Sequence, residues 1–280
     1  MPLSAGSVET KRIRKLSDAQ VEPFDMEYVE GRRWLAIREL IQRDFPDGDF
    51  TLLDVGGGNG RFADRILAEF PNSVATVLDN SESLLSRNAP NPRKTVIRES
   101  VENLASIDGS RRFDIVCFHW LLHHLVSDSY RRTSSNQLEA LKCAKRLLTP
   151  RGRISVFENM YQGYVSEGLP GLLIYHLTSA KSLTRLVRAM GANTAGVGVC
   201  FRSSRDWARM TASAGLQTAD YTEPDDWVWP QRMAWRVLLH IRSIRVGHLW
   251  LIAARQHPDE ASVQFRDGTE LSRAGTSAST

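Results

Sequence analysis

Short apolar runs alternate with amphipathic stretches along most of this chain. The runs have the length of buried strands and lie at 51–55, 74–78, 95–97, 113–118, 154–157, 216–221 and 246–253. Between them, apolar residues recur at helical spacing and predict helices over 21–45, 59–69, 82–87, 135–148 and 203–214. Strands that alternate with helices favour an α/β fold built on a doubly wound, mostly parallel sheet.

The first of these runs ends in the glycine-rich turn of the segment 51–62, TLLDVGGGNGRF. A strand, a glycine turn and a helix in this order form the place where a doubly wound sheet holds a nucleotide-like ligand. The turn does not have the spacing of the dinucleotide fingerprint, and Asn59-Gly60-Arg61 stands where a P-loop needs Gly-Lys-Ser/Thr. Asp54, one residue before the strand ends, is placed either to orient the turn or to meet a ligand's ammonium group.

A second acid, Asp79, ends the next predicted strand. It follows the glycine turn by about 20 residues, the separation at which nucleoside-binding folds place a carboxylate against the two ribose hydroxyls. Asn80 and Ser81 come directly after it and predict the N-terminal cap of the helix over 82–87. The glycine turn and Asp79 together predict a nucleoside site.

The pattern Asp-x-Gly-x-Gly-x-Gly resembles motif I of the class I S-adenosylmethionine-dependent methyltransferases. The resemblance extends over roughly 51–255, and the Leu-Leu-x-Pro-x-Gly turn at 147–152 is part of it. It implies a seven-stranded Rossmann-like sheet whose seventh strand is antiparallel. It also implies S-adenosylmethionine as the cofactor and S-adenosylhomocysteine as the product.

The resemblance assigns cofactor contacts residue by residue. The implied set is Asp54, Gly56, Gly57, Gly58, Gly60, Asp79, Asn80, Ser100, Val101, His119 and Trp120. In this assignment the glycine turn holds the methionyl part, Asp79 holds the ribose, and His119 lies under the methionine portion chiefly through its backbone. Ser100 departs from the family, which has an aspartate there against the adenine amino group, so its contact has less charge assistance.

Three residues are candidates for a general base: His123, Glu158 and His176. Methyl transfer by direct displacement needs a base when the attacking group carries a proton. His119, His123 and His124 lie within six residues of one another. Metal binding, cofactor packing and proton transfer all remain open for them. No carboxylate or thiolate in that stretch completes a ligand set, so we expect no metal.

The chain divides into an N-terminal extension over 1–48, a methyltransferase domain over 49–257 and a tail over 258–280 that we expect to be disordered. The extension is expected to form a helical lid, from which Tyr28 and Arg32 can reach the cofactor. An insertion over 159–200 is apolar and aromatic, and it shapes either a substrate pocket or a contact in a homodimer.

Composition narrows the class of protein further. The 280 residues carry a net charge of +4, but the basic residues form no dense tract interleaved with aromatics, which argues against a dedicated nucleic-acid binder. No apolar run reaches the ~20 residues that span a bilayer. Cys117, Cys143 and Cys200 are far apart and indicate reduced thiols of a cytoplasmic protein.

We therefore expect an enzyme that transfers a methyl group to O, N or C of a small, partly apolar or aromatic molecule, in a biosynthetic role. Methylation of RNA remains an alternative. So does binding of S-adenosylmethionine for another reaction or as a scaffold. A nicotinamide dehydrogenase is disfavoured by the glycine spacing and by the lack of Tyr-x-x-x-Lys.

Overall fold

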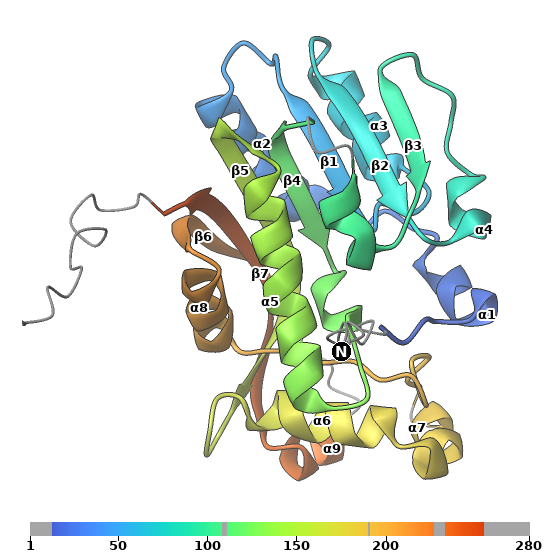
Figure 1. Ribbon diagram of the computed structural model, residues 1–280. Helices are drawn as coiled ribbons and strands as arrows, with labels where there is room; N and C mark the ends of the chain where they lie inside the picture. The colour runs from blue at the N-terminus through green and yellow to red at the C-terminus, as the bar shows by residue number, and fades with distance from the viewer. Residues whose placement is uncertain (1–12, 108–110, 190, 227–232, 255–280) are drawn as a thin grey trace, which may run out of the picture.

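The computed structural model describes residues 13–107, 111–189, 191–226 and 233–254, which build one mixed sheet with helices on both faces (Figure 1). The strand order is β3-β2-β1-β4-β5-β7-β6. The strands are β1 (Thr51–Val55), β2 (Val74–Asp79), β3 (Lys94–Arg98), β4 (Phe113–His119), β5 (Leu148–Gly163), β6 (Leu216–Asp226) and β7 (Ile241–Ala253). β7 is antiparallel to β5 and β6, and the pairs among β1 to β5 are parallel. The predicted seven-stranded fold class is confirmed.

Helices cover the two faces of the sheet, and α2, α3, α5 and α8 bury apolar residues against it. The α-helices are α1 (Asp18–Val21), α2 (Gly31–Asp44), α3 (Arg61–Glu69), α4 (Glu82–Leu85), α5 (Tyr130–Arg146), α6 (Leu169–Ser179), α7 (Thr184–Ala189), α8 (Ser204–Ser213) and α9 (Met233–Leu238). Four short 3₁₀ turns accompany them among the described residues: η1 (Glu22–Phe24), η2 (Val101–Ser106), η3 (Leu122–His124) and η4 (Lys181–Leu183). α2 and α3 pack on one face, and α5 and α8 pack on the other.

The predicted helix over 21–45 is wrong in its first half. Only α2, from Gly31 onward, is a long helix; the preceding residues form η1 and an extended segment. The carboxylate of Glu27 accepts the backbone N–H of Val29 at 2.6 Å, which offers that N–H a partner outside a helix. The extended segment reaches the carboxyl end of the sheet, where a continuous helix would not place it.

The strand predicted over 154–157 is much longer in the structure. β5 runs to Gly163 because β7 pairs with it antiparallel from Leu251 back to Ile241, well past the last residue pair between β4 and β5, His119 with Phe157. Glu158 directly follows the predicted strand over 154–157, which places it at the carboxyl end of that strand. It lies instead within β5, one residue past the end of β4.

α5 begins five residues before the predicted start at Ser135, and Ser129 caps it by accepting the N–H of Arg132. Three polar residues near its start are buried: Thr133, Asn136 and Gln137. The amide of Gln137 donates to the carbonyls of Leu122 and Cys200 at 3.0 and 3.1 Å. Buried polar side chains of this kind donate hydrogen bonds to loop carbonyls. From the sequence alone, such residues cannot be told apart from polar residues on the surface.

Among the described residues, no helix is both long and apolar enough to cross a bilayer. The predicted tail over 258–280 lies outside the described residues. The division of the chain at 48 and 257 stays a prediction.

Candidate cofactor and acceptor site

A cavity of about 610 Å³ lies where β1, β2 and β4 end, and the N-terminal segment forms part of its wall. Its position matches the rule that open α/β sheets bind ligands outside the carboxyl ends of their strands. Eleven of the predicted site residues line it: Asp54, Gly56, Gly57, Gly58, Asp79, Asn80, Ser100, Val101, His119, Trp120 and His123.

Asp54 is 3% exposed, and its Oδ2 has no hydrogen-bond partner among the described residues. Burial, followed by the negative charges of Glu27 and Asp79, raises the pKa of Asp54 to about 8. A buried carboxylate without a donor is costly unless something supplies one. The cavity therefore contains an acceptor that requires a cationic or hydrogen-bonding ligand.

The glycine turn passes so close to Asp54 that a side chain does not fit. A Cβ at Gly57 would lie 2.4 Å from Asp54 Oδ2, and Gly58 adopts a φ of +50° while it lines the cavity. Gly58 donates its N–H to Asp79 Oδ2 at 3.1 Å. The turn thus presents bare backbone to the ligand and is tied to the acid at the end of β2.

Asp79 is held from two sides, because Gly58 donates to Oδ2 and the N–H of Ser81 donates to Oδ1 at 2.8 Å. Burial raises the pKa of Asp79 in spite of these contacts. Each oxygen keeps a further lone pair for a ligand hydroxyl, so the geometry suits a vicinal diol. Ser81 accepts the N–H of Leu84 and caps α4 as predicted.

Ser100 and Val101 line the cavity beyond Asp79, together with Leu121. The hydroxyl of Ser100 donates to Glu102 Oε2 at 3.3 Å, and its N–H donates to Glu99 Oε1 at 2.7 Å. The Ser100 hydroxyl therefore already donates its hydrogen to Glu102. A hydrogen bond donated to adenine would have to replace this one.

An aromatic wall closes the opposite end of the cavity. The ring of Trp120 stacks on Phe157 with centroids 5.4 Å apart and meets Tyr28 at 5.5 Å. Trp120 has a φ of +51°, which is rare for a bulky residue, and its Nε1 donates to Asn159 Oδ1 at 3.1 Å. Strain of this kind is kept where surrounding contacts fix a functional side chain.

His119 is half-buried between Phe62 and Phe157, with ring centroids 4.6 and 5.1 Å away. Its Nε2 bonds Ser155 Oγ at 3.0 Å, and the same hydroxyl bonds His248 Nε2 at 2.9 Å. Burial, followed by the nearby His248, holds the pKa of His119 well below its usual value. His119 is a neutral packing side chain.

His123 lines the cavity and bonds Glu158, which is fully buried behind it. Nδ1 of His123 lies 2.6 Å from Glu158 Oε2, and the backbone N–H of His123 donates to Oε1 at 3.2 Å. Because a carboxylate can only accept, the hydrogen of a neutral His123 sits on Nδ1 and Nε2 carries a free lone pair. No hydrogen bond to Nε2 occurs within the described parts of the chain, so this nitrogen is available to a ligand.

Three predicted site residues do not reach the cavity. Glu158 is shielded from it by His123. His176 is exposed on α6, beyond the carboxyl ends of the strands, and it does not line the cavity. Gly60 begins α3 in the left-handed conformation, and a Cβ there would lie 1.8 Å from Asn88 Oδ1. Its requirement for glycine is therefore structural.

Other lining residues were missed or misplaced at the level of sequence. Arg33, whose guanidinium lies 5.1 Å from the Trp120 ring centroid, lines the cavity in place of the expected Arg32, which is exposed. Glu27 and Asn159 also line it. The signal that could have revealed Glu27 is an acid in a segment containing Pro23 and Gly31, where a continuous helix was assumed.

Within the described residues, no three His, Cys, Asp or Glu side chains gather in a way that could hold a metal ion. His119 ends β4 and His123 lies in η3, so the two histidines do not share a helical face. Cys117, Cys143 and Cys200 are buried free thiols.

Comparison with known proteins supports a methyltransferase domain. Residues 53–154 match the family model described as methyltransferase domain. The chain is 25% identical over 216 residues to the O-methyltransferase aclM of Aspergillus oryzae (strain ATCC 42149 / RIB 40), an alignment that covers 72% of this chain and 43% of that protein. The chain thus spans less than half the length of this curated relative.

Two solved structures are similar in fold. The plantazolicin methyltransferase BpumL in complex with SAH superposes with a TM-score of 0.54 at 14% identity, covering 85% of this chain and 90% of that one. LepI in complex with SAM superposes with a TM-score of 0.53 at 14% identity, covering 85% and 53%. These likenesses, with the strand order, show the Rossmann-like fold of class I methyltransferases.

Proposed function

We propose that this chain, which has the class I methyltransferase fold, is an S-adenosylmethionine-dependent enzyme that methylates a hydroxyl group of a small molecule. The observation that carries the proposal is the His123–Glu158 pair, which presents a basic nitrogen to the same cavity that holds Asp54 and Asp79. The identity of aclM as an O-methyltransferase supports an oxygen acceptor.

The residues present fit the cofactor. Asp79 offers two oxygens to the ribose, the bare turn at Gly57 and Gly58 accepts a close ligand, and Asp54 has an oxygen that lacks a donor. Bound S-adenosylmethionine supplies an electrophilic methyl group on a positively charged sulfur. The carboxylates lower the free energy of a cation in this cavity.

His123 acts as the general base. When a hydroxyl accepts the methyl group it loses its proton, and Nε2 of His123 is the atom that would take that proton. Glu158 positions the ring through Nδ1 and stabilises the imidazolium that forms. Tyr28 and Trp120 form an aromatic wall that favours a flat, partly apolar acceptor and excludes water.

The test is a transfer assay with the intact protein. It is incubated with methyl-labelled S-adenosylmethionine and a panel of phenols, anilines, thiols and a short RNA, and labelled products are identified by mass spectrometry. Labelled methyl ethers from phenols support the proposal. Label in the RNA or in the amines alone would overturn the assignment of the acceptor. Cofactor binding without any transfer would favour a scaffold role.

A further inference from the structure

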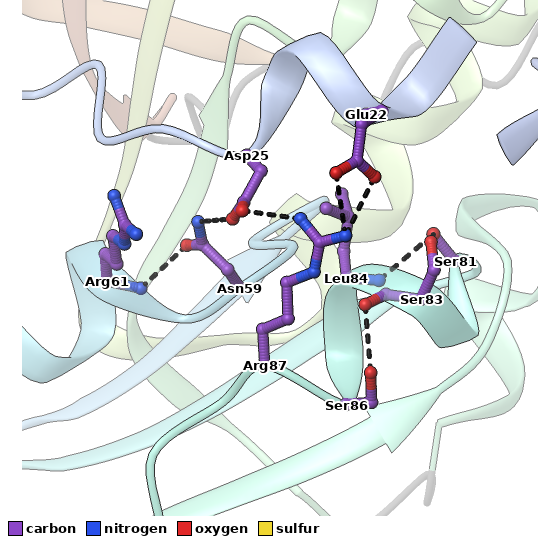
Figure 2. Close-up of polar contacts among 9 residues, drawn as sticks. All are labelled: Glu22, Asp25, Asn59, Arg61, Ser81, Ser83, Leu84, Ser86 and Arg87. Atoms are coloured by element: carbon purple, nitrogen blue, oxygen red, sulfur yellow. Dashed lines mark hydrogen bonds and ion pairs between the residues drawn. The ribbon is translucent and has the colours of Figure 1, made fainter. Parts of the chain in front are cut away.

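The N-terminal segment 22–29, here called the strap, is fastened to the glycine turn by a polar clasp (Figure 2). Asp25 accepts from Asn59 Nδ2 at 2.7 Å and pairs with Arg87 Nη1 at 2.5 Å, and Arg87 Nη2 lies 2.8 Å from Glu22 Oε2. Asn59 belongs to the glycine turn and lines the cavity, and Arg87 follows α4, so two separate elements hold the strap.

The clasp places Glu27 in the wall of the cavity. Its Oε1 accepts the N–H of Val29, and no lysine or arginine of the described residues forms a salt bridge with it. The arginines nearby have other partners: Arg33 pairs with Asp225 at 2.5 Å, and Arg65 donates to the carbonyl of Val29 at 2.7 Å. Glu27 and Asp54 line the same cavity, so a ligand bound there can meet both carboxyl groups. Burial raises the pKa of both groups, and each charge that the cavity holds adds to the need for a cation.

Two carboxyl groups in one cavity, one of them with a buried oxygen that lacks a donor, favour a cation that also donates hydrogen bonds. A sulfonium carries a positive charge but no hydrogen to donate. A primary ammonium carries the charge and three donors. The chemistry of the oxygens therefore selects the ammonium end of an amino acid over the sulfonium centre.

We propose that Glu27 and Asp54 jointly bind the α-ammonium group of the cofactor's amino-acid portion, which makes Glu27 a cofactor-binding residue contributed by the strap. The inference rests on the proposed function, because it assumes that S-adenosylmethionine occupies the cavity. The inference also couples ammonium binding to closure of the strap. Glu27 reaches the ligand only from the closed strap, so each of the two stabilises the other.

Three ligands separate the ammonium group from the rest of the cofactor. S-adenosylmethionine and S-adenosylhomocysteine carry it, and 5′-methylthioadenosine keeps the nucleoside and the sulfur but lacks the amino acid. Calorimetric titration of Glu27→Gln, compared with the unmodified chain, is expected to show affinity about 10- to 100-fold weaker for the first two ligands. Affinity for 5′-methylthioadenosine is expected to stay within about twofold, because a neutral ligand gains nothing from the carboxylate.

Glu30→Gln is the matched control, because Glu30 follows the strap, is exposed, does not line the cavity and pairs with Arg65 at 3.7 Å. It is expected to leave all three affinities unchanged. Equal weakening of 5′-methylthioadenosine by Glu27→Gln would overturn the proposal in favour of a structural role. Weakening confined to S-adenosylmethionine would overturn it in favour of the sulfonium, and unchanged affinity would refute it outright. If the unmodified chain bound none of the three, the proposed function itself would fail, and the inference with it.

Discussion

The two ends of the cavity differ in how the chain builds them. At the cofactor end, Asp54, the glycine turn and Asp79 all belong to one strand–helix–strand unit, β1-α3-β2. At the acceptor end, His123 and Glu158 are 35 positions apart, and Tyr28 comes from the strap. The first end is fixed by local geometry, and the second exists only when distant elements of the fold have come together.

The two ends also differ in electrostatics. The cofactor end holds carboxyl groups whose pKa values are raised by burial, which disfavours their ionised form. A bound cation would offset this cost, so this end gains most from a cationic ligand. At the acceptor end the one carboxylate, Glu158, is satisfied by His123 through two contacts. Under the proposed function, cofactor binding depends mainly on the first end of the cavity, and proton transfer depends on the second. Single substitutions can separate them.

The largest effect is expected from His123→Ala. Loss of the base should lower kcat for a hydroxyl acceptor by about 10²- to 10⁴-fold, since proton removal is the step that the protein performs directly. The dissociation constant of S-adenosylmethionine, measured by calorimetry, should stay within about twofold. His176→Ala is the matched control, an exposed histidine outside the cavity, and it should leave kcat unchanged. Loss of cofactor affinity in His123→Ala would break the division between the two ends.

Asp79→Ala should have the opposite profile. Losing the acceptor for the ribose hydroxyls should weaken S-adenosylmethionine, S-adenosylhomocysteine and 5′-methylthioadenosine alike, by about 10- to 100-fold, because all three carry the ribose. At saturating cofactor, kcat should return to within a few fold of its original value. Titration of the three ligands and initial rates over a range of cofactor concentrations measure both effects. A loss of kcat that saturation does not restore would place Asp79 in the chemical step.

The difference between the ends explains what the sequence could predict. β1, the glycine turn and Asp79 were all located from the sequence, because a buried strand, a tight turn and a fixed spacing leave local signatures. The antiparallel seventh strand followed from the resemblance to a family and not from any pattern in its residues. The end of β5 was missed because it depends on pairing with β7. That strand starts at Ile241, 78 residues after β5 ends at Gly163.

At the acceptor end, the sequence indicates three candidates for the general base but provides no way to rank them. His123, Glu158 and His176 had equal standing, and only the fold shows that Glu158 holds His123 while His176 lies apart. Glu27 was not considered at all. Its segment was predicted as helix, and a helix would not bring its carboxylate to the cavity. Such roles come from tertiary contacts, for which local propensity contains no information.

The pH dependence of stability tests the carboxyl groups of the cofactor end without involving the acceptor end. The folded pKa of Asp54 is raised to about 8 from 3.8, so its contribution to stability is complete below pH 4 and is lost as the pH rises towards 8. Glu27 and Asp79 act in the same direction. Asp54→Asn removes the largest of these effects. Between pH 5 and pH 9, the melting temperature of the ligand-free variant should fall less than that of the unmodified chain, by on the order of 5 °C.

Calorimetric scans at several pH values measure this difference. Parallel curves for the two proteins would show that Asp54 ionises normally. Saturating S-adenosylmethionine should reduce the fall in the unmodified chain, because a bound cation stabilises the ionised carboxylates. In Asp54→Asn the ligand should have a smaller effect at pH 9 than it has in the unmodified chain.

The smallest effect is expected from the clasp. Arg87→Ala removes both ion pairs that hold the strap, yet exposed pairs of this kind contribute little, so cofactor affinity should weaken only about two- to fivefold. The matched control is Arg98→Ala, which removes an exposed pair with Glu82 at 2.6 Å that does not touch the strap. Raising the salt concentration should reduce the difference between Arg87→Ala and the unmodified chain, since salt screens the same pairs.

The rate of cofactor release, measured by stopped flow, distinguishes a closing strap from a static one. If the strap closes over the ligand, Arg87→Ala should speed cofactor release, whereas Arg98→Ala should release the cofactor at the rate of the unmodified chain. Equal release rates would mean that the strap is already closed by Glu27 and the ligand alone, without help from the clasp.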